Sequence, residues 1–167
     1  GERLSISELV IDKGDHVLRT KGQWQNGLTT LGGELKSDDI GALFGEFDIT
    51  SAIKDSKADL NYGLTWQAAP YDFDVKPLSG EVTWDLGEGH LTEISDGGAR
   101  VFSLLSLDSL VRKLKLDFRD VFSKGFFYNS MQGSMQLENG IAYTKDTKMD
   151  GVPADLTIKG YANLNTL

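Results

Sequence analysis

Hydrophobic and polar residues alternate with a period of two over long stretches of this chain. The clearest stretch runs from Lys57 to Gln67, and its even positions are Ala58, Leu60, Tyr62, Leu64 and Trp66. Similar alternation recurs over residues 78–86, 113–118, 127–137 and 154–162. Because successive side chains of a strand point to opposite faces of a sheet, the pattern predicts strands with one dry face and one wet face.

The alternation also assigns individual side chains to the two faces. In the stretch 127–137 it predicts a dry face opposite Tyr128 and Ser130, made of Phe127, Met131, Met135 and Leu137. In the last stretch Leu156 and Ile158 fall on the dry face. The first 36 residues are less regular, and there we predict strands near 4–11, 16–25 and 28–36.

Short turn signals separate these stretches. Asn139-Gly140 stands between two alternating runs and predicts a hairpin with a type I′ turn, because this turn needs positive φ at both central residues. Asn26-Gly27 is a second candidate for such a hairpin.

Two stretches depart from the period of two. Asp39 and its neighbours can cap a short helix that extends to about Phe47. Apolar residues spaced by three and four predict an amphipathic helix over Ala99–Val111, which carries Leu104, Leu105, Leu107 and Leu110.

Together these elements predict a mainly β fold over residues 1–167, taken as one domain. We expect long antiparallel strands that form a curled, groove-like sheet with one or two short helices. The helices can cover only part of the dry face. Either the sheet folds over on itself as a sandwich, or it curls into an open trough whose dry face holds something else.

Composition narrows the possible partners. The 167 residues carry a formal net charge of -8, so a polyanion such as nucleic acid is not expected to bind. The chain has no cysteine, and no apolar run approaches the roughly 20 residues of a membrane-spanning helix. It begins at Gly1 without a methionine, and we interpret it as a fragment of a longer protein whose anchor lies elsewhere.

The side chains used for catalysis do not form a recognisable motif. His16 and His90 lack the spacing of metal ligands, and the neighbouring Glu88, His90 and Glu93 are expected to form a solvated turn. No serine stands in a GxSxG motif. We therefore predict that the chain is not an enzyme and uses no metal or cofactor.

One segment resembles a known family. Residues 99–140 combine a Leu-Leu-Ser-Leu helix at Leu104–Leu107, the basic pair Arg112-Lys113, Leu-x-Leu-Asp-Phe at Leu114–Phe118, Lys-Gly-Phe at Lys124–Phe126, and Asn139-Gly140. This pattern is similar to the C-terminal region of a member of the AsmA-like, repeating β-groove family. The similarity extends over about residues 31–163. One departure is Val111, where a proline often precedes the basic pair.

The resemblance implies a function in the envelope of Gram-negative bacteria. Proteins of this family are anchored in the inner membrane, reach across the periplasm, and are thought to pass phospholipid along a trough toward the outer membrane. For this chain it implies a non-enzymatic, lipid-conducting groove. The expected partners are phospholipid acyl chains, preceding β-groove repeats of the same chain, and the outer membrane or an outer-membrane protein.

The dry face is the expected lipid site. A strand of about ten residues spans ~33 Å, which exceeds the ~15 Å of hydrocarbon in one leaflet. Acyl chains are expected to lie against Leu60, Tyr62, Leu64, Trp66, Val82, Trp84, Met131, Met135, Leu156 and Ile158. The helix with Leu104, Leu105, Leu107 and Leu110 is expected to plug the trough.

Two other functions remain open at this point. The chain could be a structural or docking β-module that contacts an outer-membrane partner while its sheet closes over a dry core. It could also be a glycan-binding β-sandwich, for which Trp24 is the best candidate because it is expected to lie outside the regular alternation.

Overall fold

The computed structural model describes residues 3–47, 53–92, 125–153, 155–163 and 165. These residues form one antiparallel sheet of ten strands and one helix, α1 (Ile40–Glu46). The strands are β1 (Arg3–Asp12), β2 (His16–Gln25), β3 (Leu28–Ser37), β4 (Ile53–Lys54), β5 (Ala58–Trp66), β6 (Ser79–Leu86), β7 (Gly89–Leu91), β8 (Phe126–Glu138), β9 (Ile141–Gly151) and β10 (Asp155–Asn163).

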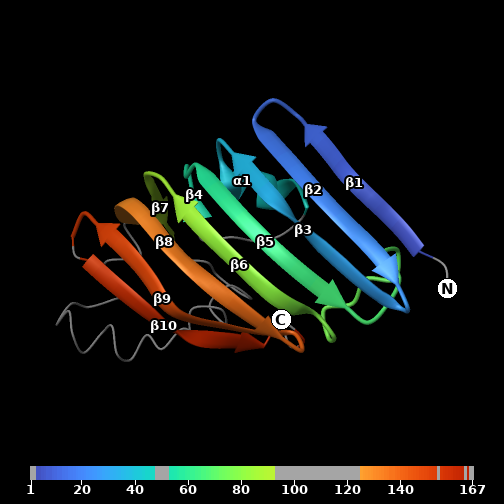
Figure 1. Ribbon diagram of the computed structural model, residues 1–167. Helices are drawn as coiled ribbons and strands as arrows, with labels where there is room; N and C mark the ends of the chain where they lie inside the picture. The colour runs from blue at the N-terminus through green and yellow to red at the C-terminus, as the bar shows by residue number, and fades with distance from the viewer. Residues whose placement is uncertain (1–2, 48–52, 93–124, 154, 164, 166–167) are drawn as a thin grey trace.

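The long strands lie side by side in the order β1, β2, β3, β5, β6, β8, β9 and β10 (Figure 1). The short strand β7 follows β6 along the same side of β8, and β4 pairs with β7. β1 and β10 stand at opposite edges of the described sheet, so the sheet is not closed (Figure 1). The sheet is also not strongly curled. The mainly β fold with long antiparallel strands is therefore confirmed. The described sheet does not fold over on itself as a sandwich, and it is less curled than the expected trough.

Both predicted Asn-Gly hairpins are present. Asn26 and Gly27 join β2 to β3 with φ angles of 53° and 76°, and Asn139 and Gly140 join β8 to β9 with 50° and 77°. Positive φ at both central residues is the type I′ geometry, whose twist matches that of the flanking strands.

The strand register brings the alternating apolar residues onto one face, here called the apolar face. Across neighbouring strands, Leu35 of β3 pairs with Leu60 of β5, and Leu60 pairs with Trp84 of β6. The pattern continues because Val82 of β6 pairs with Met135 of β8. The apolar sets of the long strands therefore form one continuous surface.

Three register shifts maintain this continuity. β1 has one residue more than β2 between Ile6 and Leu9, β8 has one more than β9 around Asn129, and β9 has one more than both neighbours between Tyr143 and Thr147. Such bulges add one unpaired residue and reverse the alternation beyond it.

The bulge at Asn129 makes one prediction wrong. The sequence pattern placed Phe127 on the dry face and Tyr128 on the wet face, but Tyr128 is buried and Phe127 is 52% exposed. The extra residue lets Tyr128 and Met131 lie on the same face although one number is even and the other odd.

The predicted short helix is confirmed. The Asp39 side chain accepts a hydrogen bond from the backbone amide of Ala42 at 3.1 Å, which satisfies one of the free amides at the start of α1. Ile40 and Leu43 are buried against the apolar face. The helix thus covers one end of that face.

The buried residues form two clusters at opposite ends of the long strands. The first includes residues of α1, β7 and β8 and is made of Ile40, Leu43, Ala58, Leu86, Leu91, Phe126, Tyr128, Met131, Met149 and Leu156. The second is made of Trp66, Leu78, Leu137 and Ala142. The middle of the apolar face lies between them.

Some predicted elements lie outside the described residues, namely the helix over Ala99–Val111 with its four leucines and the strand at residues 113–118. Within the described part of the chain, no helix has the length and apolarity needed to cross a membrane.

Two glycines should respond in opposite ways to replacement by alanine. Gly80 has φ of 139°, and a Cβ atom there would collide with the carbonyl oxygen of Gly63 on β5. We expect Gly80→Ala to lower the free energy of unfolding by about 2–3 kcal/mol.

Gly45 provides the matched control, because it is an exposed helical residue and a Cβ atom on it would meet nothing within 4 Å. Gly45→Ala should raise the free energy of unfolding by about 0.5–1 kcal/mol. Urea denaturation of both variants measures the effect, and a stable Gly80→Ala protein would contradict the close approach of β5 and β6.

Candidate functional site

A cavity of about 470 Å³ lies over the apolar face between the two clusters. Among the described residues, its lining contains no acidic or basic side chain. The lining residues are Ile40, Phe44, Ile53, Leu60, Val82, Trp84, Leu86, Met131, Met135, Ala142, Tyr143, Thr144, Thr147, Ile158, Gly160 and Tyr161. The volume lies in the range of roughly 300–1,000 Å³ that is typical of small-molecule sites.

The sheet supplies most of the lining, and α1 with β4 supplies a cover at one end. Ile40 and Phe44 are four residues apart, so they lie on the same side of α1. Ile53 of β4 lines the same end. This end of the cavity is therefore enclosed by segments that are distant from β8–β10 in the sequence.

Trp84 lies beside a position that has no side chain. Gly133 of β8 is the register partner of Trp84, and a Cβ atom on it would come within 3.0 Å of the indole Cζ2. The glycine therefore leaves room for the indole ring beside β8, where Trp84 lines the cavity.

The bulge in β9 shapes the wall of the cavity. Thr144 and Thr147 both line it, and their hydroxyl oxygens are 2.6 Å apart in a mutual hydrogen bond. Each hydroxyl therefore has a partner within the wall, which keeps this part of the lining weakly polar.

Asp146 holds the bulge from the other side. Its carboxylate accepts hydrogen bonds from the backbone amide of Ser134 at 2.9 Å and from the Ser134 hydroxyl at 2.7 Å. The hydrogen bonds from Ser134 favour the charged form and lower the pKa of Asp146 below its ordinary value. At the bulge Ser134 has no register partner on β9, and the Asp146 carboxylate serves as the acceptor for its backbone amide.

Six of the ten predicted lipid-contacting residues line the cavity, namely Leu60, Val82, Trp84, Met131, Met135 and Ile158. Trp66 and Leu156 are buried within the two end clusters. Tyr62 and Leu64 share the apolar face with them through the pairing of β5 with β6, and Leu64 packs against the second cluster.

Other lining residues were not predicted from the sequence. The spacing of Ile40 and Phe44 predicts that both lie on one side of the short helix. The neighbouring sequence does not predict which part of the sheet that helix packs against. Thr144 and Thr147 are polar residues that reach the wall only through the bulge in β9.

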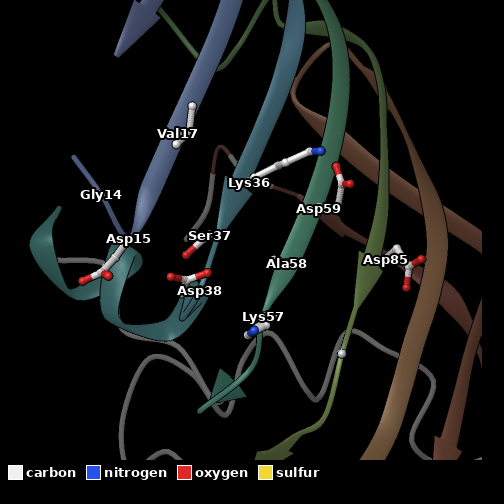
Figure 2. A pocket seen from close by; sticks show the side chains of 11 residues that line it. Gly14, Asp15, Val17, Lys36, Ser37, Asp38, Lys57, Ala58, Asp59 and Asp85 are labelled. Carbon is white, nitrogen blue, oxygen red and sulfur yellow. The ribbon is translucent and has the colours of Figure 1, made fainter. Parts of the chain in front are cut away.

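The opposite face of the sheet is polar. There Lys36, Asp59 and Asp85 are successive register partners on β3, β5 and β6, and they line a shallow depression of about 390 Å³ (Figure 2). The Lys36 side chain extends toward Asp59 in Figure 2, and Gln132 donates a hydrogen bond to Asp85 at 3.3 Å. Among the described residues no three acidic or histidine side chains are grouped as metal ligands would be.

The two histidines have separate structural surroundings. The Nδ1 atom of His16 is 2.8 Å from the Ser37 hydroxyl, and its Nε2 atom is 3.8 Å from the Glu46 carboxylate at the end of α1. His90 stacks on Phe127 with ring centroids 4.8 Å apart.

Trp24 lies on the apolar face, where it pairs with Leu4 of β1 and Thr29 of β3. The expectation that it stands outside the alternation is therefore wrong. It is partly buried, and Tyr71 contacts it edge-on, which does not resemble an open aromatic platform for a glycan.

The Asp146 bridge should be sensitive to acid. Because the folded-state pKa is lowered, the contribution to stability is fully present above the unfolded-state pKa and is lost as pH falls through the folded-state pKa, at pH below about 4. At neutral pH, the Ser134 amide hydrogen should exchange faster in Asp146→Ala than in the parent protein. In the parent protein, the same loss of protection should occur only in acid.

Amide exchange of Ser134, corrected for the intrinsic effect of pH, measures this loss. Lys145→Ala changes the neighbouring residue of the same bulge and should leave the exchange rate of Ser134 unchanged. Equal rates in the parent and in Asp146→Ala would show that the carboxylate does not hold the bulge.

Comparison with known proteins identifies the family. The family model described as YhdP protein matches residues 1–167. The intermembrane phospholipid transporter YhdP of Escherichia coli (strain K12) is 37% identical over 169 residues, and the match covers 98% of this chain but only 13% of that relative. No solved structure matches the chain. The family resemblance carried by residues 99–140 is confirmed, and the comparisons specify it further: the chain belongs to the YhdP family.

Proposed function

We propose that this chain forms part of a non-enzymatic groove that conducts phospholipid between the inner and outer membranes. The observation that carries the proposal is the cavity over the apolar face, whose described lining offers no charged group. Such a surface suits a hydrocarbon chain. The relative named as an intermembrane phospholipid transporter supports the same class of cargo.

The acyl chain is the part of the lipid that the cavity would hold. Each methylene group sheltered from water contributes about 0.8 kcal/mol, so ten of them would contribute about 8 kcal/mol before the costs of binding are subtracted. The polar headgroup would stay at the open side in water, because the described lining has no cation to pair with a phosphate.

The groove would run across the strands and not along them. The two buried clusters close the ends of the strands, whereas apolar side chains continue from strand to strand between them. At the β1 edge, Leu4, Ile6 and Ile11 are 45–50% exposed. We infer that lipid reaches the cavity from the β1 side, where the apolar face is open.

The free edge of β1 fits pairing with a preceding β-groove repeat of the same protein. β1 is hydrogen-bonded on one side only, to β2, in the described sheet. An unpaired edge with a half-exposed apolar face favours the addition of another strand. This protein would be anchored in the inner membrane by a part outside this segment, would cross the periplasm, and would contact the outer membrane or a protein in it.

Charging the cavity should remove the lipid without unfolding the chain. Trp84→Glu places a carboxylate in the apolar lining, where desolvation opposes both the charge and a neighbouring acyl chain. Thr83→Glu is the matched control, since Thr83 lies next along β6 and faces the polar side of the sheet. Lipid extraction and mass spectrometry of the purified proteins should find phospholipid in the control and parent but not in Trp84→Glu.

A second variant fills the cavity without adding charge. Val82→Trp should also exclude the lipid, while circular dichroism and thermal unfolding show that the sheet persists. If both folded variants retain phospholipid, or if the same substitutions in the full-length protein leave transport intact, the groove proposal is wrong. The chain would then be better explained as a docking module.

A further inference from the structure

The loop between β5 and β6, residues 67–78, crosses one end of the apolar face and is fixed at both stems. At its start, the Thr29 hydroxyl donates to the Ala68 carbonyl at 2.6 Å and the Trp66 indole donates to the Ala69 carbonyl at 3.1 Å. At its end, the backbone amide of Leu78 donates to the Val75 carbonyl at 3.0 Å, and Leu78 is buried.

The middle of this loop rests on the sheet through two aromatic pairs. Tyr71 meets Trp24 edge-on with ring centroids 6.1 Å apart, and Phe73 meets Trp66 edge-on at 5.3 Å. Tyr71 is nevertheless 85% exposed and Phe73 is 54% exposed. The contacts are therefore shallow, and little buried area holds the middle of the loop down.

The indole nitrogen of Trp24, the ring that Tyr71 contacts, lacks a hydrogen-bond partner in the described part of the chain. The Nε1 atom of Trp24 is buried and has no hydrogen-bond partner among the described residues, whereas Nε1 of Trp66 donates to Ala69. Buried N–H groups without a partner are rare in folded proteins because they lose their bonds to water without replacement. The donor of Trp24 is therefore free to bond to an acceptor that comes within reach.

Trp24 stands where the apolar face meets water. It lies two residues before the Asn26-Gly27 turn at the end of β2, beside the half-exposed Leu4 of β1. Tryptophan suits such a boundary, because its ring is apolar and its N–H is a donor. An amphiphile whose chain lies on the apolar face would have its polar atoms at such a boundary.

We propose that residues 67–78 form a movable strap, and that lifting Tyr71 lets the Trp24 N–H donate to an ester or phosphate oxygen of a phospholipid on the apolar face. This rests on the proposed function, since the lipid is the same cargo. The stem bonds at Ala68, Ala69 and Leu78 would stay in place. The strap would then give the groove an N–H donor at the edge of the apolar face.

The tryptophans of the chain report on the two steps separately. The chain has three of them, and Trp84 lines the cavity while Trp24 contacts the strap through Tyr71. Indole N–H signals of a ¹⁵N-labelled sample are assigned with Trp24→Phe and Trp84→Phe. The sample is then titrated with a short-chain diacyl phosphatidylcholine below its micellar concentration, and separately with decane, which has no acceptor oxygen.

Phosphatidylcholine should perturb the Trp84 signal and shift the Trp24 N–H signal downfield, as expected for a new hydrogen bond, whereas decane should perturb Trp84 alone. A response of Trp84 to phosphatidylcholine with an unchanged Trp24 would overturn the strap proposal and leave the groove intact. If neither signal responds, both the groove and the strap proposals fail.

Substitutions of Tyr71, Phe73 and Trp24 test the cover and the donor. In the lipid-free protein, Tyr71→Ala should speed exchange of the Trp24 indole hydrogen, while Phe73→Ala, which removes only the contact with Trp66, should not. Trp24→Phe keeps a ring but removes the donor, and should weaken phosphatidylcholine binding by about three- to ten-fold without changing decane binding. Unchanged exchange in Tyr71→Ala, or equal losses for both ligands in Trp24→Phe, would refute the proposal.

Discussion

The structure depends on one constraint, which is that every long strand must present its apolar residues to the same face. A slip of one residue in any strand would turn its whole apolar set toward water. The pairs Leu35 with Leu60, Leu60 with Trp84, and Val82 with Met135 meet this condition in regular register. Where the alternation would fail, an extra residue in β1, β8 or β9 restores it.

The sequence predicted the parts of the fold that depend on neighbouring residues. The period of two, the two Asn-Gly turns and the cap at Asp39 are local signals, and each produced the expected element. The exchange of Phe127 and Tyr128 could not be predicted, because a bulge is set by the pairing of β8 with β9. The docking of α1 over the strands likewise depends on contacts between distant segments, so Ile40 and Phe44 were missed as lining residues.

An open apolar face conflicts with stability, and the two clusters show how the chain accommodates both. Side chains such as Ile40, Tyr128 and Met149 are almost fully buried at one end of the strands, and Trp66 and Leu78 are buried at the other. Burial at the ends stabilises the sheet, while the residues between the clusters stay available. Trp84 illustrates the division, because it packs against the first cluster and also lines the cavity.

A conduit must bind its cargo strongly enough to admit it and weakly enough to release it. If an acyl chain were fully enclosed, the gross contribution of ten methylenes would correspond to an affinity of about 1 μM, and a longer chain would bind more tightly still. Partial enclosure avoids this trap, since each methylene left in contact with water contributes less. The apolar side chains are half-exposed at β1, whereas Leu86 and Met131 in the cavity lining are buried, so a lipid that moves from the β1 side into the cavity would become more sheltered. Release from the sheltered end would then require part of that cover to open, which places the control of release in the segments over the apolar face and not in the sheet beneath them.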